Sequence, residues 1–468
     1  MTILDQDKRL GISSESRVPS REPRFPAARG FSWLIATLLL LCLFINYIDR
    51  QTLSVLVRFL PANLKMSNLT YGRIQSLFLL AYSLAMPLAG WTVDRLGTRT
   101  GLAVTVAIWS VIEFLHGTAR RVTTLGAYRF LLGVPEAAGL PAVSKAAAEH
   151  ASPHGRAALI GIAMFGLGMG STLAPPVVAF LTIHFNWSWA FYATGLAGIV
   201  WVAVWLIFYR AMPEAGMGSP EFAGDSMARE APVALHAGTE REFRPHASAH
   251  IPWSVLLRDQ RVIGLTLSRA FADSAWWFYL FWIPPFLNQA RGLDLHQMGI
   301  LGWIPYFFAS IGSVVGGYAS GYFVRHGSKP LHARRAIMWA CACVVPFTSL
   351  VVGVSSVAAV LALLAIATFF IQGFFANVFS LPADLFPHQK VASVFGLNTM
   401  AGGLAGFLTV QGAGYLVDRF SYVPVFLTVA FFLPAGALCA QLLVPSGTEK
   451  PESIPVLAKQ PRPSAAEP

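Results

Sequence analysis

The amino-acid sequence predicts an all-α integral membrane protein with twelve transmembrane helices in two six-helix, pseudo-symmetric bundles. Hydrophobic residues make up 55% of the 468-residue chain and charged residues only 12%, whereas roughly a quarter of the residues in soluble globular domains are charged. Twelve apolar runs approach or exceed the roughly 20 residues of a membrane-spanning helix, and they are far longer than the roughly ten residues of a barrel strand. A polar stretch over 211–256 divides the runs into two sets of six.

The apolar runs define the expected spans, and the polar segments around them define the expected regions. The spans are expected at 32–57, 69–91, 99–118, 123–147, 157–183, 188–210, 261–288, 298–323, 336–354, 357–382, 391–416 and 421–444. The regions are a cytoplasmic tail, a first six-helix bundle, a cytoplasmic central loop, a second bundle and a second cytoplasmic tail, at 1–31, 32–210, 211–260, 261–444 and 445–468. In transporters built from such repeats, the substrate site lies near the membrane midplane between the repeats.

The distribution of charge excludes some partners and sets the expected orientation. The net charge of +11 does not indicate a nucleic-acid partner, because the basic residues lie on short loops and tails. With both termini in the cytoplasm, most Lys and Arg residues face the cytoplasm, as the positive-inside rule requires. The four cysteines lie in apolar runs without disulfide or metal-ligand spacing. We therefore expect no metal and no cofactor.

The segment between the second and third spans carries a recognisable motif. Residues 90–99 read Gly-Trp-Thr-Val-Asp-Arg-Leu-Gly-Thr-Arg, which resembles the G-x-x-x-D-R/K-x-G-x-R/K signature of the major facilitator superfamily. We expect Gly90 to permit close helix approach, Gly97 to permit a tight turn, and Asp94 to pair with a basic group or a helix N-terminus on a neighbouring helix. The predicted conformational latch comprises Gly90, Asp94, Arg95, Gly97 and Arg99. In the second half Gly321 stands in place of the aspartate, so the predicted latch is asymmetric.

Further segments resemble one branch of that superfamily, the anion:cation symporter family, and are most like its hexuronate and aldonate transporters. They are residues 45–55, 129–142, 251–282 and 371–377. The resemblance implies proton-coupled uptake of an organic acid anion, driven by the proton gradient, in a bacterial inner membrane. We expect a monomer. The chain departs from the family pattern at Pro135, at Leu140-Pro141 and at 164–170, so a less hydroxylated acid stays open as substrate.

Charged residues inside two of the apolar runs are the main candidates for function. A charge at the bilayer centre costs about 2.5–3.5 kcal/mol by insertion scales, so such groups must pair or face a wet site. Asp49 and Arg50 lie deep in the first span, and Arg129 and Glu136 lie two turns apart in the fourth. Arginine suits a substrate carboxylate, and proton coupling needs a carboxylate whose proton affinity depends on burial and on a nearby arginine.

These residue types predict separate roles for the four charged groups. We expect Asp49 and Glu136 to couple transport to protons, and Arg50 and Arg129 to bind substrate. A fixed interhelical salt-bridge network is the alternative. Glu113, buried in the third span, has no partner recognisable from the sequence, and an interhelical hydrogen bond is its expected role.

Aromatic and neutral polar residues complete the predicted substrate site. The family resemblance implies that Tyr47 and Tyr82 contact substrate hydroxyls. Trp276 and Tyr279, near mid-depth in the seventh span, suit stacking on a sugar acid or, equally, simple packing. The neutral polar candidates are Gln372, Asn377 and Asn398, each of which has interhelical hydrogen bonding as its alternative.

Three other functions compete with that of a proton symporter of an organic anion. An exporter or exchanger of aromatic acids or drugs belongs to the same class of protein. A membrane-embedded enzyme is disfavoured, because the sequence has no nucleophile motif, no metal-ligand spacing and no nucleotide-binding loop. A transport-dead nutrient sensor would be expected to lack Asp49 or Glu136, or to carry a folded cytoplasmic domain.

Overall fold

The computed structural model describes residues 33–151, 155–209 and 256–445, and these residues form helices and connecting turns without any β-strand. Both predicted tails and most of the predicted central loop lie outside the described residues. The first half contains α1 (Trp33–Leu56), η1 (Ala62–Leu64), α2 (Asn68–His116), α3 (Val122–Glu136), α4 (Gly139–His150), α5 (Arg156–His184) and α6 (Trp187–Phe208). The second half contains α8 (Gln260–Arg291), α9 (Leu295–Leu301), α10 (Ile304–Arg325), α11 (Pro330–Val344), η3 (Val345–Val352), α12 (Val357–Leu385), α13 (His388–Arg419), α14 (Tyr422–Ala430) and α15 (Phe432–Leu443).

The described helices account for the twelve predicted spans. Nine helical segments in this part of the chain are long and apolar enough to cross a membrane. One of them, α2, contributes two spans, because Gly97 has a φ of 75° and interrupts the helix there. Two further spans are more broken or less apolar than these nine segments. The fourth is divided into the short helices α3 and α4, and the seventh, α8, carries charges and many Trp and Pro residues.

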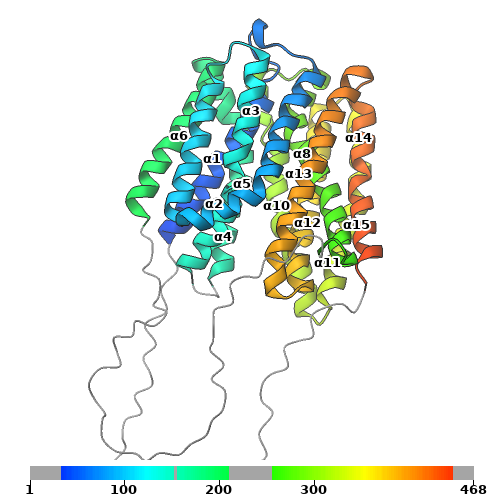
Figure 1. Cartoon of the computed structure of the whole chain (residues 1–468). Coiled ribbons are helices and arrows are strands. Elements are labelled where there is room, and N and C mark those ends of the chain that lie inside the picture. Colours follow the sequence, from blue (N-terminus) through cyan, green and yellow to red (C-terminus); the bar gives the residue numbers. More distant parts are fainter. Residues whose placement is uncertain (1–32, 152–154, 210–255, 446–468) are drawn as a thin grey trace, which may run out of the picture.

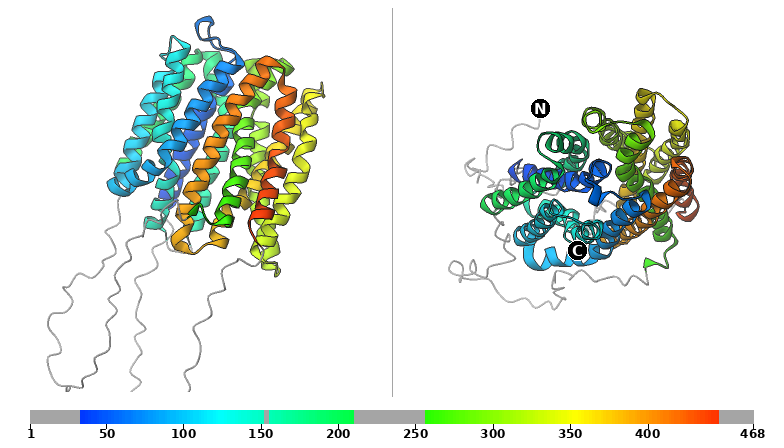
Figure 2. Two further views of the ribbon diagram at one scale, coloured as in Figure 1. Left: turned by 45° about the vertical axis from the view of Figure 1, so that its right-hand side comes forward. Right: turned by 90° about the horizontal axis from the view of Figure 1, so that it is seen from above.

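The two halves form two groups of helices with equivalent internal packing, as Figures 1 and 2 show. The first and fifth spans (α1 and α5) pack against each other, as do the seventh and eleventh (α8 and α13). In each pair two glycines one turn apart face the partner helix: Gly166 and Gly170 lie against α1, and Gly402 and Gly406 lie against α8. Such small-residue contacts let membrane helices approach closely. The offset of six spans is the pseudo-symmetry that the sequence predicts.

The two groups of helices are joined tightly at the end of the molecule where α2 begins and α13 ends, which we call the Asp418 end. The Asp418 carboxylate accepts hydrogen bonds from the backbone N–H groups of Asn68 (3.0 Å) and Leu69 (2.7 Å), the first residues of α2. A carboxylate at a helix N-terminus satisfies free N–H groups and favours the helix dipole. Nearby, the Tyr71 hydroxyl donates to the Phe281 carbonyl (2.7 Å), so polar contacts cross between the halves at several levels.

The predicted latch lies at the opposite end, and its charged residues contact helices of their own half. Lys145 of α4 lies 3.3 Å from the Asp94 carboxylate, and Arg99 donates to the Leu206 carbonyl of α6 (2.8 Å). Arg95 lies over the ring of Trp91. The expected reason for Gly90 is wrong, because no atom lies within 4 Å of the position that a Cβ would take there. The motif therefore ties α2 to α4 and α6 in this structure.

We predict that Asp418→Ala weakens the contact between the halves at the Asp418 end by about 1 kcal/mol, the usual contribution of a helix N-cap. Spin labels on the exposed residues Lys65 and His296, one on each half, should give a longer and broader distance distribution by double electron–electron resonance. Asp294→Ala is the matched control, because Asp294 caps α9 within one half. An unchanged distribution in Asp418→Ala would show that this carboxylate does not hold the halves together.

Candidate functional site

A buried ion pair between α1 and α3 lies at the centre of the candidate site. The Arg50 Nε lies 2.6 Å from the Glu136 Oε2, and the two side chains are 5% and 0% exposed. The sequence places both residues in the site but does not identify them as partners. Within the described residues the terminal nitrogens of Arg50 make no ion pair, so they are available for a further carboxylate.

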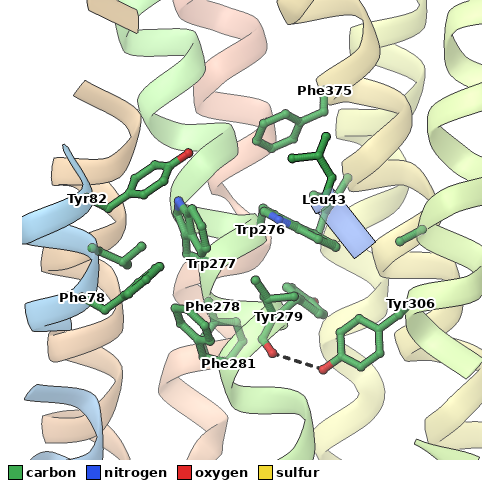
Figure 3. Close-up of a cluster of buried hydrophobic side chains, with 14 of the residues drawn as sticks. Leu43, Phe78, Tyr82, Trp276, Trp277, Phe278, Tyr279, Phe281, Tyr306 and Phe375 are labelled. Carbon is green, nitrogen blue, oxygen red and sulfur yellow. Dashed lines mark hydrogen bonds between the residues drawn. The ribbon is translucent and has the colours of Figure 1, made fainter. Parts of the chain in front are cut away.

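Four aromatic rings surround the Arg50 guanidinium, and we call them the aromatic box. Its members are Tyr47, Phe78, Tyr82 and Trp277, whose ring centroids lie 4.9, 5.5, 4.7 and 5.7 Å from the Arg50 Cζ. Three of these residues belong to the first half, whereas Trp277 comes from α8 of the second half. The box therefore joins the two halves around one cation. Figure 3 shows Phe78, Tyr82 and Trp277 facing each other. Aromatic faces attract a cation, more strongly where water is excluded.

Gly133 brings Glu136 close enough to reach Arg50. A Cβ at position 133 would overlap the backbone of Phe78 and Tyr82 on α2. Only glycine therefore allows α3 to approach α2 this closely, one turn before Glu136 and beside two members of the aromatic box.

Arg129 of α3 is engaged with the backbone of α1. The side chain is fully buried, and both terminal nitrogens donate to the backbone carbonyl of Asp49, each at 3.3 Å. In this structure the Arg129 guanidinium holds the main chain of α1, and binding of substrate by Arg129 stays a prediction. Asp49 is likewise fully buried and lies close to Thr194 of α6, behind the Arg50–Glu136 pair.

The structure places the aromatic residues of the seventh span in different surroundings. The predicted contact residue Tyr279 is 1% exposed, and its ring packs against Phe426 of α14 (5.9 Å) within the second half. Trp276 is buried beside it (Figure 3). Trp277, which is not among the predicted site residues, contacts the ring of Tyr82 (6.4 Å) and Arg50 instead. A helix turns about 100° per residue, so adjacent tryptophans face different neighbours, and the aromatic run itself does not indicate which one faces the site.

The neutral polar candidates Asn377, Asn398 and Gln372 differ in the hydrogen bonds that they make. Asn377 is fully buried and donates to the Gly316 and Gly373 carbonyls, so it joins α10 to α12, which is the alternative role expected for it. Asn398 accepts a hydrogen bond from Thr266 of α8 (2.7 Å). Gln372 is half-buried on α12.

A second buried ion pair lies in α8, away from the aromatic box. The Arg269 Nε lies 2.6 Å from the Asp273 Oδ2, and the Arg269 guanidinium lies 3.8 Å from the ring centroid of Phe379. The Asp273 carboxylate also faces Gly402 of α13. The sequence signal for this pair is opposite charges four residues apart in an apolar span, and Arg269 is absent from the predicted site.

The glycine-rich segment of the fifth span mostly serves packing. Gly166 and Gly170 face the backbone of α1, whereas a Cβ at Gly168 would contact Ser310 of α10 in the other half. Within the segment 164–170, where the chain departs from the family pattern, these two glycines are therefore packing residues.

The chain is similar in sequence to known transporters along most of its length. Residues 39–410 match the Major Facilitator Superfamily. A hexuronate transporter from Escherichia coli (strain K12) is 28% identical over 411 residues, covering 88% of this chain and 93% of the relative. A D-galactonate transporter from Escherichia coli O6:H1 is 25% identical over 88% of this chain and 95% of the relative. A hexuronate transporter from Bacillus subtilis is 27% identical over 86% of this chain and 94% of the relative. These relatives confirm the resemblance to sugar-acid transporters.

Solved structures show the same fold. A bacterial homolog of the human lysosomal transporter Spinster superposes with a TM-score of 0.61 in its inward-facing, unoccupied form. The superposition covers 88% of this chain and 94% of that structure, and the two sequences are 16% identical. The occupied form of the same homolog superposes with a TM-score of 0.62. The chain therefore belongs to the major facilitator superfamily, and it is a multi-pass membrane transport protein rather than an enzyme.

Proposed function

We propose that the protein is a proton-coupled symporter of an organic acid anion of the hexuronate or aldonate type, working by alternating access. The observation that carries this proposal is the Arg50–Glu136 ion pair inside the aromatic box. In this pair Arg50 provides a cation for the substrate carboxylate, and Glu136, which is bound to that cation, is a carboxylate that can take up a proton. The sugar-acid relatives support the substrate class.

The ion pair links the binding of substrate to that of the proton. When Glu136 is ionised it occupies Arg50, and a second carboxylate would bring excess negative charge into a buried site. When Glu136 is protonated, the Arg50 guanidinium loses its charged partner and can hold the substrate carboxylate through two parallel hydrogen bonds. The faces of Tyr82 and Trp277 then suit the C–H surface of a sugar ring, and the Tyr47 and Tyr82 hydroxyls suit its hydroxyl groups.

The proposal includes an orientation and a setting. The Asp418 end faces the outside, and the end carrying the Asp94–Lys145 pair faces the cytoplasm together with both termini and the central loop over 211–260. The setting is a bacterial inner membrane, and the transporting unit is a monomer. The proton gradient is the energy source, with Asp49 and Glu136 as the coupling carboxylates and no metal or cofactor.

The aromatic box also favours a second candidate, exchange or export of aromatic acids. Four rings around one arginine suit a planar carboxylate as well as a sugar acid.

We predict gradient-dependent uptake of at least one sugar acid into proteoliposomes that contain the purified protein. The panel should include labelled D-glucuronate, D-galacturonate, D-galactonate and aromatic acids, each with and without an inward proton gradient. Uptake of aromatic acids alone would favour the second candidate. Failure of the gradient to drive uptake of every acid in the panel would remove the symport proposal.

Replacing Glu136 by Gln should abolish proton-driven accumulation while counterflow of internal against external substrate continues. Glutamine cannot take up the proton, yet it leaves Arg50 without a charged competitor. Glu149→Gln is the matched control, because Glu149 accepts hydrogen bonds from Thr98 and Tyr209 in the same half but outside the site. Accumulation by Glu136→Gln at the wild-type level would exclude this role for Glu136.

Replacing Arg50 by Lys should weaken substrate binding about 10- to 100-fold. An ammonium group cannot form the paired hydrogen bonds of a guanidinium, and one hydrogen bond to a charged group contributes about 1.5–3 kcal/mol. Calorimetric titration with the transported acid measures the effect. Arg334→Lys, which alters a pairing with Asp384 in the second half, should bind normally. Equal affinity of Arg50→Lys and the wild type would place the substrate carboxylate elsewhere.

A further inference from the structure

Glu113 and His116 lie one turn apart on the second half of α2, and the function proposed above uses neither of them. Both side chains are fully buried, and the Glu113 Oε2 lies 3.6 Å from the His116 Nδ1. Among the described residues, no hydrogen-bond partner is found for either Glu113 oxygen or for the His116 Nε2. Burying polar atoms without partners is unfavourable, so packing alone does not account for this pair.

The contacts of His116 assign the two nitrogens of its ring. The Nδ1 lies 2.8 Å from the Ile112 carbonyl oxygen, which can only accept a hydrogen bond, so Nδ1 carries the hydrogen. In the neutral ring Nε2 then has the free lone pair. The ring is held in place by Phe191 of α6, which stacks on it at 5.4 Å, and by Tyr128 of α3 at 5.6 Å. His116 therefore has one nitrogen beside Glu113 and another ready to accept a proton.

Other ionisable groups reach this pair from two neighbouring helices. Glu113 lies within electrostatic range of Asp49 on α1 and of Arg129 and Glu136 on α3, and Arg129 also acts on His116. Tyr128 is the further titratable group of α3 at the ring, and the contact from α6 is the apolar ring of Phe191. His116 is the last residue of α2, at the Asp418 end, and Glu113 lies one turn further from that end along the helix.

Counting charges shows that this cluster must hold a proton. Among the described residues, the carboxylates of Asp49, Glu113 and Glu136 face two permanent cations, the guanidinium groups of Arg50 and Arg129. With His116 neutral, one negative charge would remain uncompensated inside a buried cluster, which is strongly unfavourable. A single proton shared between Glu113 and His116 neutralises the cluster.

We propose that Glu113 and His116 are a proton relay between the Asp418 end and the coupling carboxylates. The Nε2 of His116 accepts a proton, and Nδ1 gives its hydrogen to the Glu113 Oε2, so the ring stays neutral and the carboxylate becomes the acid. Glu113 then passes the proton toward Asp49 and Glu136, and tautomer exchange, in which Nε2 loses a proton and Nδ1 gains one, restores the first arrangement of His116. This inference rests on the proposed function, because a relay is needed only if transport is coupled to protons.

The test compares proton-driven uptake with counterflow in proteoliposomes, using labelled D-glucuronate or whichever acid of the panel the wild type accumulates. In Glu113→Gln the initial rate of gradient-driven uptake should fall at least about tenfold, since positioned acid–base groups accelerate proton transfer by about 100-fold or more. Counterflow, which does not require net proton transfer, should stay at the wild-type rate. His116→Gln, whose amide can still donate to the Ile112 carbonyl, should give the same pattern and serves if Glu113→Gln does not fold.

The control and the contrary outcomes separate the relay from a structural role. Glu149→Gln should retain both uptake and counterflow. Loss of counterflow together with uptake, or wild-type uptake in both relay variants, would overturn the relay and leave the symport proposal intact. Wild-type uptake that ignores the proton gradient would instead overturn the proposed function, and the relay with it.

Discussion

The difficulty of burying charge in an apolar helical bundle governs the organisation of this transporter. Leaving one member of a buried ion pair without its partner costs about 3–5 kcal/mol, so each ionisable group must be matched by another or hold a proton. In the first half this requirement places Arg50 against Glu136 and joins Arg129 to the main chain at Asp49. A site that must remain neutral will exchange one negative group for another, and that exchange is the physical basis of the coupling we propose.

The two halves have similar frameworks but contribute different chemistry. Equivalent helix pairs pack through glycines in both halves, yet the buried charge of the first half is concentrated around Arg50, whereas the second half offers Trp277 and a separate Arg269–Asp273 pair. The aromatic box is therefore complete only when the halves meet. A rocking motion that moved α8 away from α2 would change the surroundings of Arg50 without disturbing its ion pair with Glu136, because that pair lies within one half.

Hydrophobic run length predicts the twelve-helix fold from the sequence, and the match is good because lipid leaves few alternatives to a helix. The charged residues of the first and fourth spans are also recognisable, since charge in an apolar run is unfavourable unless it is used. Their pairing is not recognisable, because it depends on how α1 and α3 are rotated. Rotation likewise decides that Trp277, rather than Tyr279, faces Arg50.

Long-range partners explain most of what the sequence does not reveal. Asp418 lies near the end of a span and reads as an ordinary polar terminus, yet it caps a helix 350 residues away. His116 is three residues from Glu113 and is in principle visible as a helical neighbour. Its importance appears only when Asp49, Arg129 and Glu136 are counted with it. For Gly90 the sequence suggests too much, because the motif predicts a packing role that the surroundings of this residue do not require.

The central claim is that a proton on Glu136 replaces Arg50 as the partner of that carboxylate when substrate binds. The most direct measurement is the number of protons taken up on binding, obtained by calorimetric titration of the substrate in buffers of different ionisation enthalpy. We predict uptake of close to one proton by the wild type and of none by Glu136→Gln, with tighter wild-type binding as the pH falls. Binding without proton uptake by the wild type, or undiminished uptake by Glu136→Gln, would contradict it.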